Sequence, residues 1–305
     1  MRVALIYNPK AGAERTTGEE LGDLIHAAGH DVTRHSSKDD HLAALLDAQP
    51  ELVAIAGGDG TVSKVVKLVM GRGIPLAVLP TGTANNIART LGVARIALAR
   101  QIAGWPHWRR TPLNVGLARG PWGSRHFVES VGMGLLAWSI PQADSSAMLH
   151  HMDGAQKKLA YVRKMLADRL EHAPLLRCKA SLDGREVSGD YMLIEAMNIR
   201  SIGPRLALAP DADPGDGLLD VVAVSRANAK KLRKHLAASG NRSGHLADLP
   251  RHRGRELRME WTESEIHFDD DMWPDGQTIG STARAIDIKL EDDAVEFLVP
   301  RRDRR

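Results

Sequence analysis

The chain has 305 residues, of which 43% are hydrophobic and 26% are charged, and its formal net charge is +3. This length and composition allow a sizeable buried core, favour two domains over one, and exclude a disordered or fibrous protein. The single cysteine, Cys178, excludes an intramolecular disulfide and a multi-cysteine metal site. No secretory pattern follows Met1, and no apolar run approaches the roughly 20 residues of a membrane span. We therefore expect a cytoplasmic protein whose membrane contact is at most peripheral.

Basic residues gather in three segments of the C-terminal half, although the net charge is small. Such clusters are ordinarily solvated surface; the alternative is attraction to anionic lipid head groups at the inner face of the membrane. Nucleic acid is not expected as a partner, because only 4% of the residues are aromatic and no nucleic-acid motif is present. The clusters are Lys230, Lys231, Arg233 and Lys234; Arg251, Arg253 and Arg255; and Arg301, Arg302, Arg304 and Arg305.

The first third of the chain alternates short apolar runs with patterns of helical spacing. The runs at 3–7, 32–35, 52–56 and 74–79 predict strands, and apolar positions between them, such as Leu21, Leu24 and Ile25, predict helices. Strands that alternate with helices form a doubly wound parallel sheet. Ligands bind beyond the carboxyl ends of the strands in such a sheet, so we expect the loops after these strands to form the site.

The loop Gly57-Gly58-Asp59-Gly60-Thr61 joins the third of these runs to a valine-rich helical pattern. Glycines let the main chain approach a polyanion, and amides at the positive end of the helix can then bind phosphate oxygens. The carboxylate of Asp59 would repel phosphate unless a cation lies between them, so it indicates Mg²⁺. The alternative is a tight turn in which Asp59 serves as an N-cap.

Two more loops follow predicted strands of the same sheet. Asn8-Pro9-Lys10-Ala11-Gly12 comes after the first strand, and Pro80-Thr81-Gly82-Thr83-Ala84-Asn85-Asn86 comes after the fourth. Hydroxyl and amide side chains at the start of a helix can bond phosphate, ribose or base, although they also make ordinary caps. We expect both loops to lie at the edge of the sheet that carries the glycine-rich loop.

The pattern changes after about Arg109. The segment 127–140 is apolar, with Gly132 and Gly134 embedded in it, and 156–172 predicts a helix. From Leu175 onward, short strands separated by turns such as Asp183-Gly184 predict an antiparallel sandwich or barrel. We therefore predict one domain over residues 1–120 and a β-rich domain over residues 121–305, whose last residues can pack back on the first domain.

In this order and at this spacing, the three loops resemble the catalytic domain of the diacylglycerol kinase and sphingosine kinase superfamily. The chain as a whole looks like the soluble bacterial lipid kinases of that superfamily; Asn198 and the runs 208–212 and 216–220 are similar to their second-domain signatures. The resemblance implies an α/β fold: a Rossmann-like, doubly wound parallel sheet of the NAD-kinase/diacylglycerol-kinase type, then a β-rich antiparallel sandwich that binds lipid. It also implies ATP with Mg²⁺ as the donor and a site between the two domains.

The resemblance further implies which residues bind the nucleotide and a metal. Ser36 stands near the place of a nucleotide-contacting threonine of the family. The Asp213–Asp220 loop is similar to a Mg²⁺-binding loop in which Asp216 contributes its carboxylate and Asp213 and Leu218 their main-chain carbonyls; a β-turn with incidental acids is the alternative. The implied ATP-binding residues are Asn8, Pro9, Lys10, Ala11, Gly12, Ser36, Gly57, Gly58, Asp59, Gly60, Thr61, Val62, Ser63, Thr83 and Asn85.

Two segments are candidates for the general base. The family carries Asp-Gly-Glu at the end of a late strand, where the Glu accepts the proton. Asp269-Asp270-Asp271 follows the predicted strand 266–268, whereas Asp275-Gly276-Gln277 keeps the first two letters but has no carboxylate at the third position. We favour Asp271 as the base with Asp269 as its acidic companion, against a merely solvated acidic loop. The chain also departs from the family at Asn86, where an Asp is usual.

The sequence thus predicts an ATP- and Mg²⁺-dependent kinase that phosphorylates a lipid hydroxyl, with Asp59, Asp269 and Asp271 in catalytic roles. The lipid would enter near 131–140, and the chemical identity of the lipid stays open because acyl pockets are built from generic apolar residues. One alternative is an NAD kinase, since the Gly-Gly-Asp-Gly loop is shared with that family. The other is a nucleotide- or lipid-binding protein without catalysis, suggested by Asn86 and Gln277.

Overall fold

The computed structural model describes residues 1–10, 16–238, 248–262, 264–273, 283–291 and 295–301. The chain forms two compact units, each described by itself below. The first comprises Met1–Leu113 and Asp293–Arg305, and the second comprises Asn114–Asp292. The C-terminal strand therefore belongs to the first unit rather than to the segment that precedes it in sequence.

The first unit is built on a sheet with the strand order β2-β1-β3-β4-β19-β5. The pairs β1–β2, β1–β3, β3–β4 and β4–β19 are parallel, and only the β19–β5 pair of this sheet, within the described residues, is antiparallel. The N-terminal parallel sheet predicted from the sequence is thereby confirmed. Its strands are β1 (Arg2–Tyr7), β2 (Asp31–Ser36), β3 (Leu52–Gly57), β4 (Leu76–Pro80), β5 (Arg109–Leu113) and β19 (Val295–Val299).

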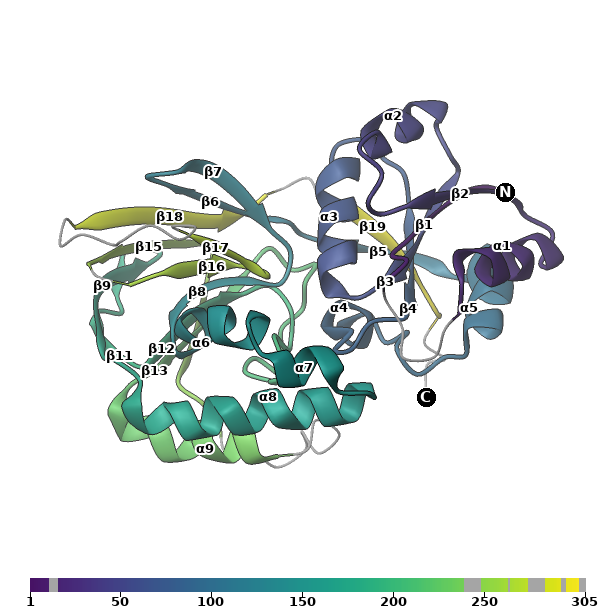
Figure 1. Cartoon of the computed structure of the whole chain (residues 1–305). Coiled ribbons are helices and arrows are strands. Elements are labelled where there is room, and N and C mark those ends of the chain that lie inside the picture. The colour runs from purple at the N-terminus through teal and green to yellow at the C-terminus, as the bar shows by residue number, and fades with distance from the viewer. Residues whose placement is uncertain (11–15, 239–247, 263, 274–282, 292–294, 302–305) are drawn as a thin grey trace. The chain divides into compact units, whose positions relative to one another are not determined.

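Helices cover both faces of this sheet, with α1 and α5 on one face and α3 on the other (Figure 1). Leu21 and Ile25 of α1 pack with Ile102 of α5 in one buried cluster, together with alternate residues of the strands. Side chains of successive strand residues point to opposite faces, so each strand supplies both layers. The helices are α1 (Gly18–Ala27), α2 (Leu42–Leu45), η1 (Leu46–Ala48), α3 (Asp59–Val69), α4 (Asn86–Thr90), α5 (Leu98–Gly104) and η2 (Trp105–His107).

The second unit contains two sheets in which every described strand pair is antiparallel. One has the order β10-β9-β15-β18-β6-β7, with β11 also on β9, and the other has the order β14-β13-β12-β8-β16-β17. The strands are β6 (Gly116–Gly120), β7 (Gly123–Phe127), β8 (Ser130–Gly134), β9 (Leu176–Leu182), β10 (Arg185–Glu186), β11 (Gly189–Tyr191), β12 (Leu193–Met197), β13 (Leu219–Val224), β14 (Arg251–Gly254), β15 (Glu256–Trp261), β16 (Ile266–Phe268), β17 (Asp271–Trp273) and β18 (Arg284–Leu290).

The two sheets enclose a shared core, which makes the second unit a sandwich. Phe127 and Trp261 from one sheet and Phe268 from the other are fully buried in one cluster. Burying side chains of this size stabilises the fold by about 2–3 kcal/mol each. The β-rich antiparallel sandwich expected from the sequence is confirmed.

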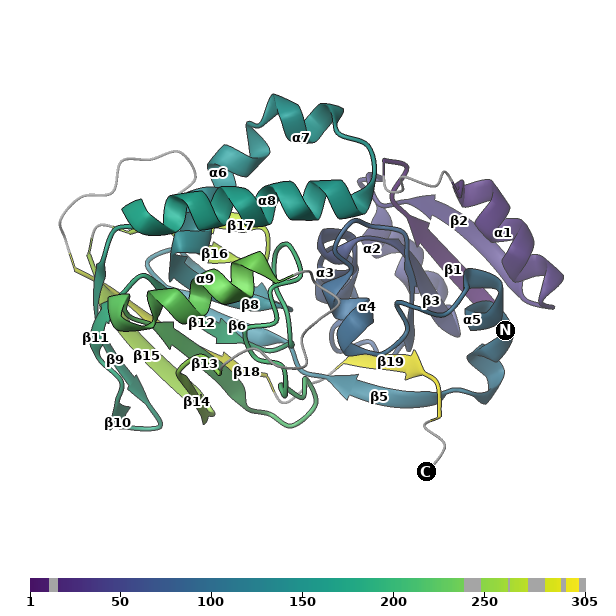
Figure 2. The ribbon, with the colours of Figure 1, turned by 90° about the horizontal axis from the view of Figure 1, so that it is seen from below.

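A layer of helices covers the other face of the second sheet. Leu166 of α8 and Leu232 of α9 pack there against Leu193 and Val222 of the strands, and α8 and α9 lie side by side (Figure 2). The helices are α6 (Leu135–Asp144), α7 (Ala147–His151), α8 (Ala155–Arg169), η3 (Leu170–His172), η4 (Arg226–Asn228) and α9 (Ala229–Ala237). Within the described ranges, none of the helices has the length and apolar character of a bilayer span.

Candidate functional site

The three predicted loops meet at one edge of the parallel sheet. Strands β1 and β3 are neighbours, while β2 lies beyond β1 and β4 beyond β3, so the chain leaves β1 and β3 in opposite directions. That arrangement is the topological switch point at which doubly wound folds bind ligands. Tyr7 is level with Ala56, and Gly57 is level with Pro80. The loops after β1, β3 and β4 therefore start at the same height.

Hydrogen bonds join these loops to one another. The amide of Asn8 donates to Ala56 O (2.9 Å), and its Nδ2 donates to Thr61 Oγ1 (3.4 Å). The side chain of Asn8 also accepts from the amide of Lys10 at 3.0 Å, which folds a local turn that leaves Pro9 and Lys10 exposed. Ala11 and Gly12 lie outside the described residues.

Two glycines bring the loop after β3 and the loop after β4 into main-chain contact. A Cβ added at Gly82 would lie 2.2 Å from the Cα of Gly58, and a Cβ at Gly58 would lie 3.3 Å from the Cα of Gly82. No side chain fits between them, so these glycines are required by close approach. The result is a cradle of bare main chain at the start of α3, with Gly60 exposed and Val62 and Ser63 buried. Such a cradle suits a phosphate chain.

The carboxylate of Asp59 links α3 to α4. Its Oδ1 accepts a hydrogen bond from the amide of Ile87 (2.9 Å), in the first turn of α4. A carboxylate at a helix N-terminus is stabilised by the unsatisfied amides there. Asp59 thus has a structural role that the sequence did not reveal, because its partner lies 28 residues away. A carboxylate beside a phosphate cradle also fits a bridging cation, and its Mg²⁺ role stays a prediction.

The loop after β4 is braced by its own asparagine. Asn85 adopts a positive φ of 54°, its Oδ1 accepts from the amide of Gly82 (3.0 Å), and its Nδ2 donates to Gly82 O (2.8 Å). The side chain of Asn85 therefore shapes the cradle from within. Thr83 is exposed at the tip of the loop, where its hydroxyl can meet a ligand, and Asn86 is buried beneath.

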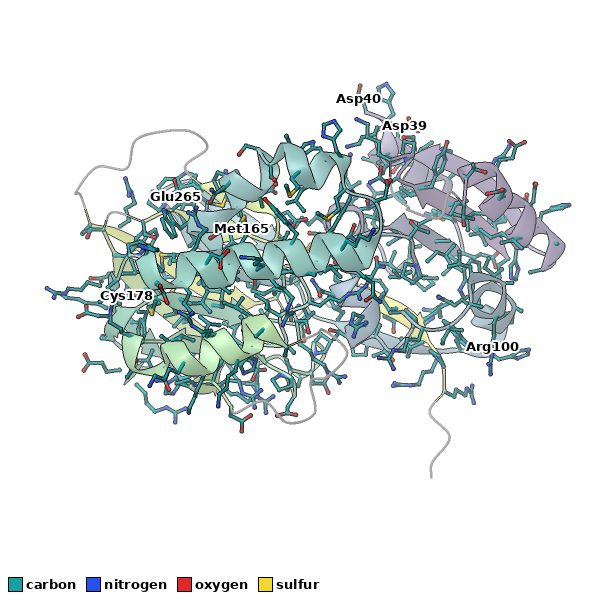
Figure 3. The ribbon with its side chains drawn as sticks, turned by 60° about the horizontal axis from the view of Figure 1, so that its bottom comes forward. Asp39, Asp40, Arg100, Met165, Cys178 and Glu265 are labelled. Atoms are coloured by element: carbon teal, nitrogen blue, oxygen red, sulfur yellow. The ribbon has the colours of Figure 1, made fainter. Side chains whose placement is uncertain are left out.

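Ser36 ends β2 at the same edge of the sheet. It is level with Tyr7, its Oγ accepts from the amide of Lys38 (3.1 Å), and its amide donates to Asp39 (2.9 Å). Asp39 and Asp40 project from the surface at this turn (Figure 3). Lys64 of α3 reaches the same turn and donates to Ser37 O (2.6 Å). Lys64 is an exposed cation of α3 that the sequence analysis missed; its position five residues after Asp59, in the helix that follows the glycine-rich loop, was the available signal.

In the second unit, the predicted metal loop is held by its own polar groups. The carboxylate of Asp216 accepts from the amide of Leu218 (2.9 Å), and the carbonyl of Asp213 accepts from the amide of Asp216 (3.3 Å). Asn114 holds the loop from outside: its amide donates to Pro214 O (2.7 Å). No group of three metal-ligating side chains occurs among the described residues. The predicted set does not require one, since two of its ligands are main-chain carbonyls.

An arginine competes with a metal ion for Asp216. The guanidinium of Arg253 contacts both the Asp216 carboxylate and the buried Asp220 carboxylate, the latter at 3.5 Å. Arg251 also contacts the Asp220 carboxylate (3.4 Å) and, beyond it, the Asp211 carboxylate (3.1 Å). Burial raises the pKa of Asp220, and the two arginines oppose that shift. A Mg²⁺ ion on Asp216 would have to displace the Arg253 guanidinium, so we derive no reaction step through this loop.

The candidate base lies on the hairpin of β16 and β17. Phe268 pairs with Asp271, which makes Asp269 and Asp270 the two-residue turn, and Asp271 is exposed. The carboxylate of Asp269 accepts from the amides of Val128 (2.9 Å) and Glu129 (2.7 Å). Asp269 is therefore suited to holding the turn, and Asp271 to chemistry. The competing segment Asp275-Gly276-Gln277 lies outside the described residues.

A glycine-rich cradle at the switch point of a parallel sheet suits the phosphates of a nucleotide, and the chain continues from that sheet into a β-sandwich. Residues 2–109 match the diacylglycerol kinase catalytic domain, and residues 140–292 match the YegS C-terminal NAD kinase beta sandwich-like domain. The chain is 28% identical to a diacylglycerol kinase of Bacillus subtilis over 262 residues, which cover 81% of each chain. It therefore belongs to the bacterial lipid kinases of the diacylglycerol kinase catalytic-domain superfamily.

Solved structures agree on the fold. A diacylglycerol kinase from Bacillus anthracis superposes with a TM-score of 0.67 at 19% identity, covering 98% of this chain and 96% of that one. An NAD kinase from Archaeoglobus fulgidus, solved in complex with ATP, gives a TM-score of 0.54 at 12% identity, covering 97% and 93%. At such identities the likeness concerns the fold and not the substrate.

Proposed function

We propose that this lipid kinase transfers the γ-phosphoryl group of ATP, with Mg²⁺, to a hydroxyl group of diacylglycerol or a related lipid. The observation that carries the proposal is the main-chain contact of Gly58 with Gly82, which forms a phosphate cradle at the switch point of the sheet. The name diacylglycerol kinase, borne by a relative that matches over most of its length, supports the lipid acceptor.

In this proposal the first unit holds the nucleotide. The loops containing Asn8, Gly57–Ser63 and Thr83 bind the phosphates and the adenosine through amides and hydroxyls. Mg²⁺ would neutralise the phosphate oxygens when bound, with Asp59 as its protein partner. Positioning and charge stabilisation then provide most of the rate acceleration, because the protein has little covalent work to do in phosphoryl transfer.

The second unit supplies the proton acceptor. The lipid hydroxyl oxygen forms a bond to the γ-phosphorus, the bond from that phosphorus to the β–γ bridging oxygen breaks, and ADP leaves. Asp271 takes the hydroxyl proton, a role that its exposure permits. Asp269 keeps the turn in place through the amides of Val128 and Glu129.

We further propose that the enzyme reaches its lipid through peripheral contact with an anionic membrane surface. Lys230, Lys231, Arg233 and Lys234 are exposed on α9, while Leu232 and Leu236 bury the opposite stripe of that helix. Each basic residue near an anionic surface contributes about 1 kcal/mol of attraction. The identity of the lipid follows from the assay below and not from this surface.

The experiment is transfer of labelled γ-phosphate to a panel of lipids in mixed micelles, with NAD as a separate acceptor. The panel contains diacylglycerol, phosphatidylglycerol, a sphingoid base and a polyprenol. We expect one lipid to be labelled and Asp271→Asn to lower kcat roughly 10²- to 10⁴-fold, the usual worth of a general base. The matched control is Asp270→Asn, an exposed acid one residue away. Labelling of NAD alone, or binding of ATP without transfer to any acceptor, contradicts the proposal.

A further inference from the structure

A buried glutamate and histidine contact each other beside the hairpin that carries Asp271. Glu195 of β12 and His267 of β16 flank the central strand β8 at the level of Gly132. His267 Nε2 lies 2.9 Å from one carboxylate oxygen of Glu195 and 3.1 Å from the other. The two side chains are only 0% and 4% exposed. A Cβ at Gly132 would lie 2.1 Å from the Glu195 carboxyl, so the glycine makes room for this pair.

Both ring nitrogens of His267 face hydrogen-bond acceptors. Nε2 faces the Glu195 carboxylate, and Nδ1 lies 3.0 Å from the carbonyl oxygen of Asp269. A neutral imidazole has one N–H and would turn a lone pair toward one of these oxygens, whereas the imidazolium donates to both. Burial acts to lower the pKa of His267, but Glu195 and the Asp269 carbonyl outweigh it and raise that pKa above its ordinary value. The two contacts and the raised pKa fit a charged ring paired with the Glu195 carboxylate.

The acceptor of the second bond is the turn of the candidate catalytic hairpin. Asp269 has a positive φ of 54°, a conformation that aspartate adopts in turns more readily than most residues with a side chain. Its amide donates to Ser130 O (2.9 Å), and its carboxylate accepts from the amides of Val128 and Glu129. His267 reaches the turn from the helix-covered side of the sheet, where Nδ1 lies near the carbonyl oxygen of Asp269. Asp271 begins the next strand, two residues beyond Asp269.

We propose that Glu195 and His267 are positioning residues for phosphoryl transfer: the charged pair holds the Asp269 carbonyl and so sets the place of the Asp271 carboxylate. This inference rests on the proposed role of Asp271 as general base. Neither member of the pair touches the reacting atoms. Their effect passes through the turn, where a displacement of about 1 Å can cost roughly 10²-fold in rate.

The test is the pH profile of kcat in Glu195→Gln, a change that keeps the shape of the side chain and removes its charge. In the native enzyme the pKa of the ring is raised, so the contribution of the charged ring is lost only as pH rises through that raised pKa. Without the carboxylate, burial prevails and the ring loses its proton at lower pH. The groups that act on the ring are Glu195 from β12 and Asp269 from its own hairpin.

We expect kcat of Glu195→Gln to fall roughly ten- to hundredfold where its ring is neutral, with a new limb that recovers as pH falls through the lowered pKa of the ring, and an unchanged KM for ATP. His267→Gln serves as the second variant, because its amide donates a hydrogen bond at every pH; its kcat is lowered without the new limb. The matched control is Arg163→Met, which removes another buried charge of the same unit. It should lower Tm without changing the shape of the profile.

A Glu195→Gln enzyme that loses thermal stability but keeps the native pH profile of kcat would overturn the positioning role. Failure of the underlying function is distinguished by Asp271→Asn measured in parallel. If Asp271→Asn is fully active, Asp271 is not the general base and the proposed function needs another. If Asp271→Asn is inactive while the pH profile of kcat of Glu195→Gln matches that of the native enzyme, only the positioning inference fails. Should Glu195→Gln not fold, the fall in kcat of His267→Gln against that of Arg163→Met decides the question.

Discussion

At the scale of single residues, Asp59 combines two roles that a substitution by alanine cannot separate. Its Oδ1 accepts the amide of Ile87, and its charge is the proposed partner of Mg²⁺. Asp59→Asn keeps an oxygen acceptor and removes the charge, whereas Asp59→Ala removes both. We expect Asp59→Asn to lose activity with nearly native stability, and Asp59→Ala to lose activity and about 1 kcal/mol of stability. Phosphoryl-transfer rates and urea unfolding measure the two effects; more than a few per cent of native activity in Asp59→Asn contradicts the metal role.

Arg253 provides a second prediction at this scale. Its guanidinium occupies the Asp216 carboxylate that the family resemblance assigns to Mg²⁺. Arg253→Ala frees that carboxylate, so Mg²⁺ should raise the Tm of this variant by several degrees in the absence of ATP and change the native Tm less. Arg255→Ala is the matched control, because Arg255 is an exposed arginine two residues further along the chain, between β14 and β15. Equal Mg²⁺ shifts in the native protein and Arg253→Ala would show that the guanidinium does not compete.

The residue types of the site could be predicted from the sequence, but several of their contacts could not. Glycines around Asp59 indicate phosphate and a cation from local chemistry alone. The hydrogen bond between Asp59 and Ile87 joins residues 28 positions apart. The hydrogen bonds that Asp269 accepts from Val128 and Glu129 join residues about 140 positions apart. Such contacts depend on how strands pair, which no local pattern specifies.

At the scale of elements, prediction succeeded where the turn or the period was unambiguous. Asp183 and Gly184 both have positive φ, and Leu182 pairs with Arg185, as the predicted two-residue hairpin requires. The apolar run 127–140 was harder, because it divides between β8 and α6. Gly134 makes that break: its φ is 87°, and a Cβ there would lie 2.3 Å from Met192 O. When a segment is buried on all sides, its apolar residues show neither the two-residue period of a strand nor the 3.6-residue period of a helix. The sequence pattern therefore cannot locate the change from strand to helix.

Helix α9 provides the prediction at this scale. Lys230 and Lys234 lie one turn apart on its exposed face. Neutralising both in Lys230→Gln/Lys234→Gln should weaken binding to phosphatidylglycerol vesicles by roughly 30-fold, the equivalent of about 2 kcal/mol. Binding to neutral phosphatidylcholine vesicles should not change. Lys179→Gln/Lys289→Gln, two exposed lysines of the other sheet of the same unit, is the control; an equal loss there means that net charge, and not α9, governs adsorption.

At the scale of the whole molecule, the two units are not consecutive in the chain. Strand β19 inserts between β4 and β5: its Phe297 is level with Leu76 of β4 and with Thr111 of β5. The apolar run 295–299 is typical of a strand, but its place in the sheet is a non-local property. The first unit can therefore be completed only after the second unit has been synthesised.

Removing β19 should unfold the first unit and leave the second folded. Val295, Phe297, Leu298 and Val299 are all buried, and losing their burial costs roughly 6–12 kcal/mol, which is comparable to the whole stability of a domain of about 5–15 kcal/mol. A chain ending at Glu291 keeps the sandwich core intact, while a chain ending at Arg301 retains β19 and is the control. Hydrogen exchange should show fast amides in β1, β3 and β4 and protected amides in β12 and β15 of the shorter chain. Protection of β3 and β4 in that chain would mean that the four N-terminal strands fold alone, and the C-terminal strand would then be an addition to a complete sheet rather than part of its core.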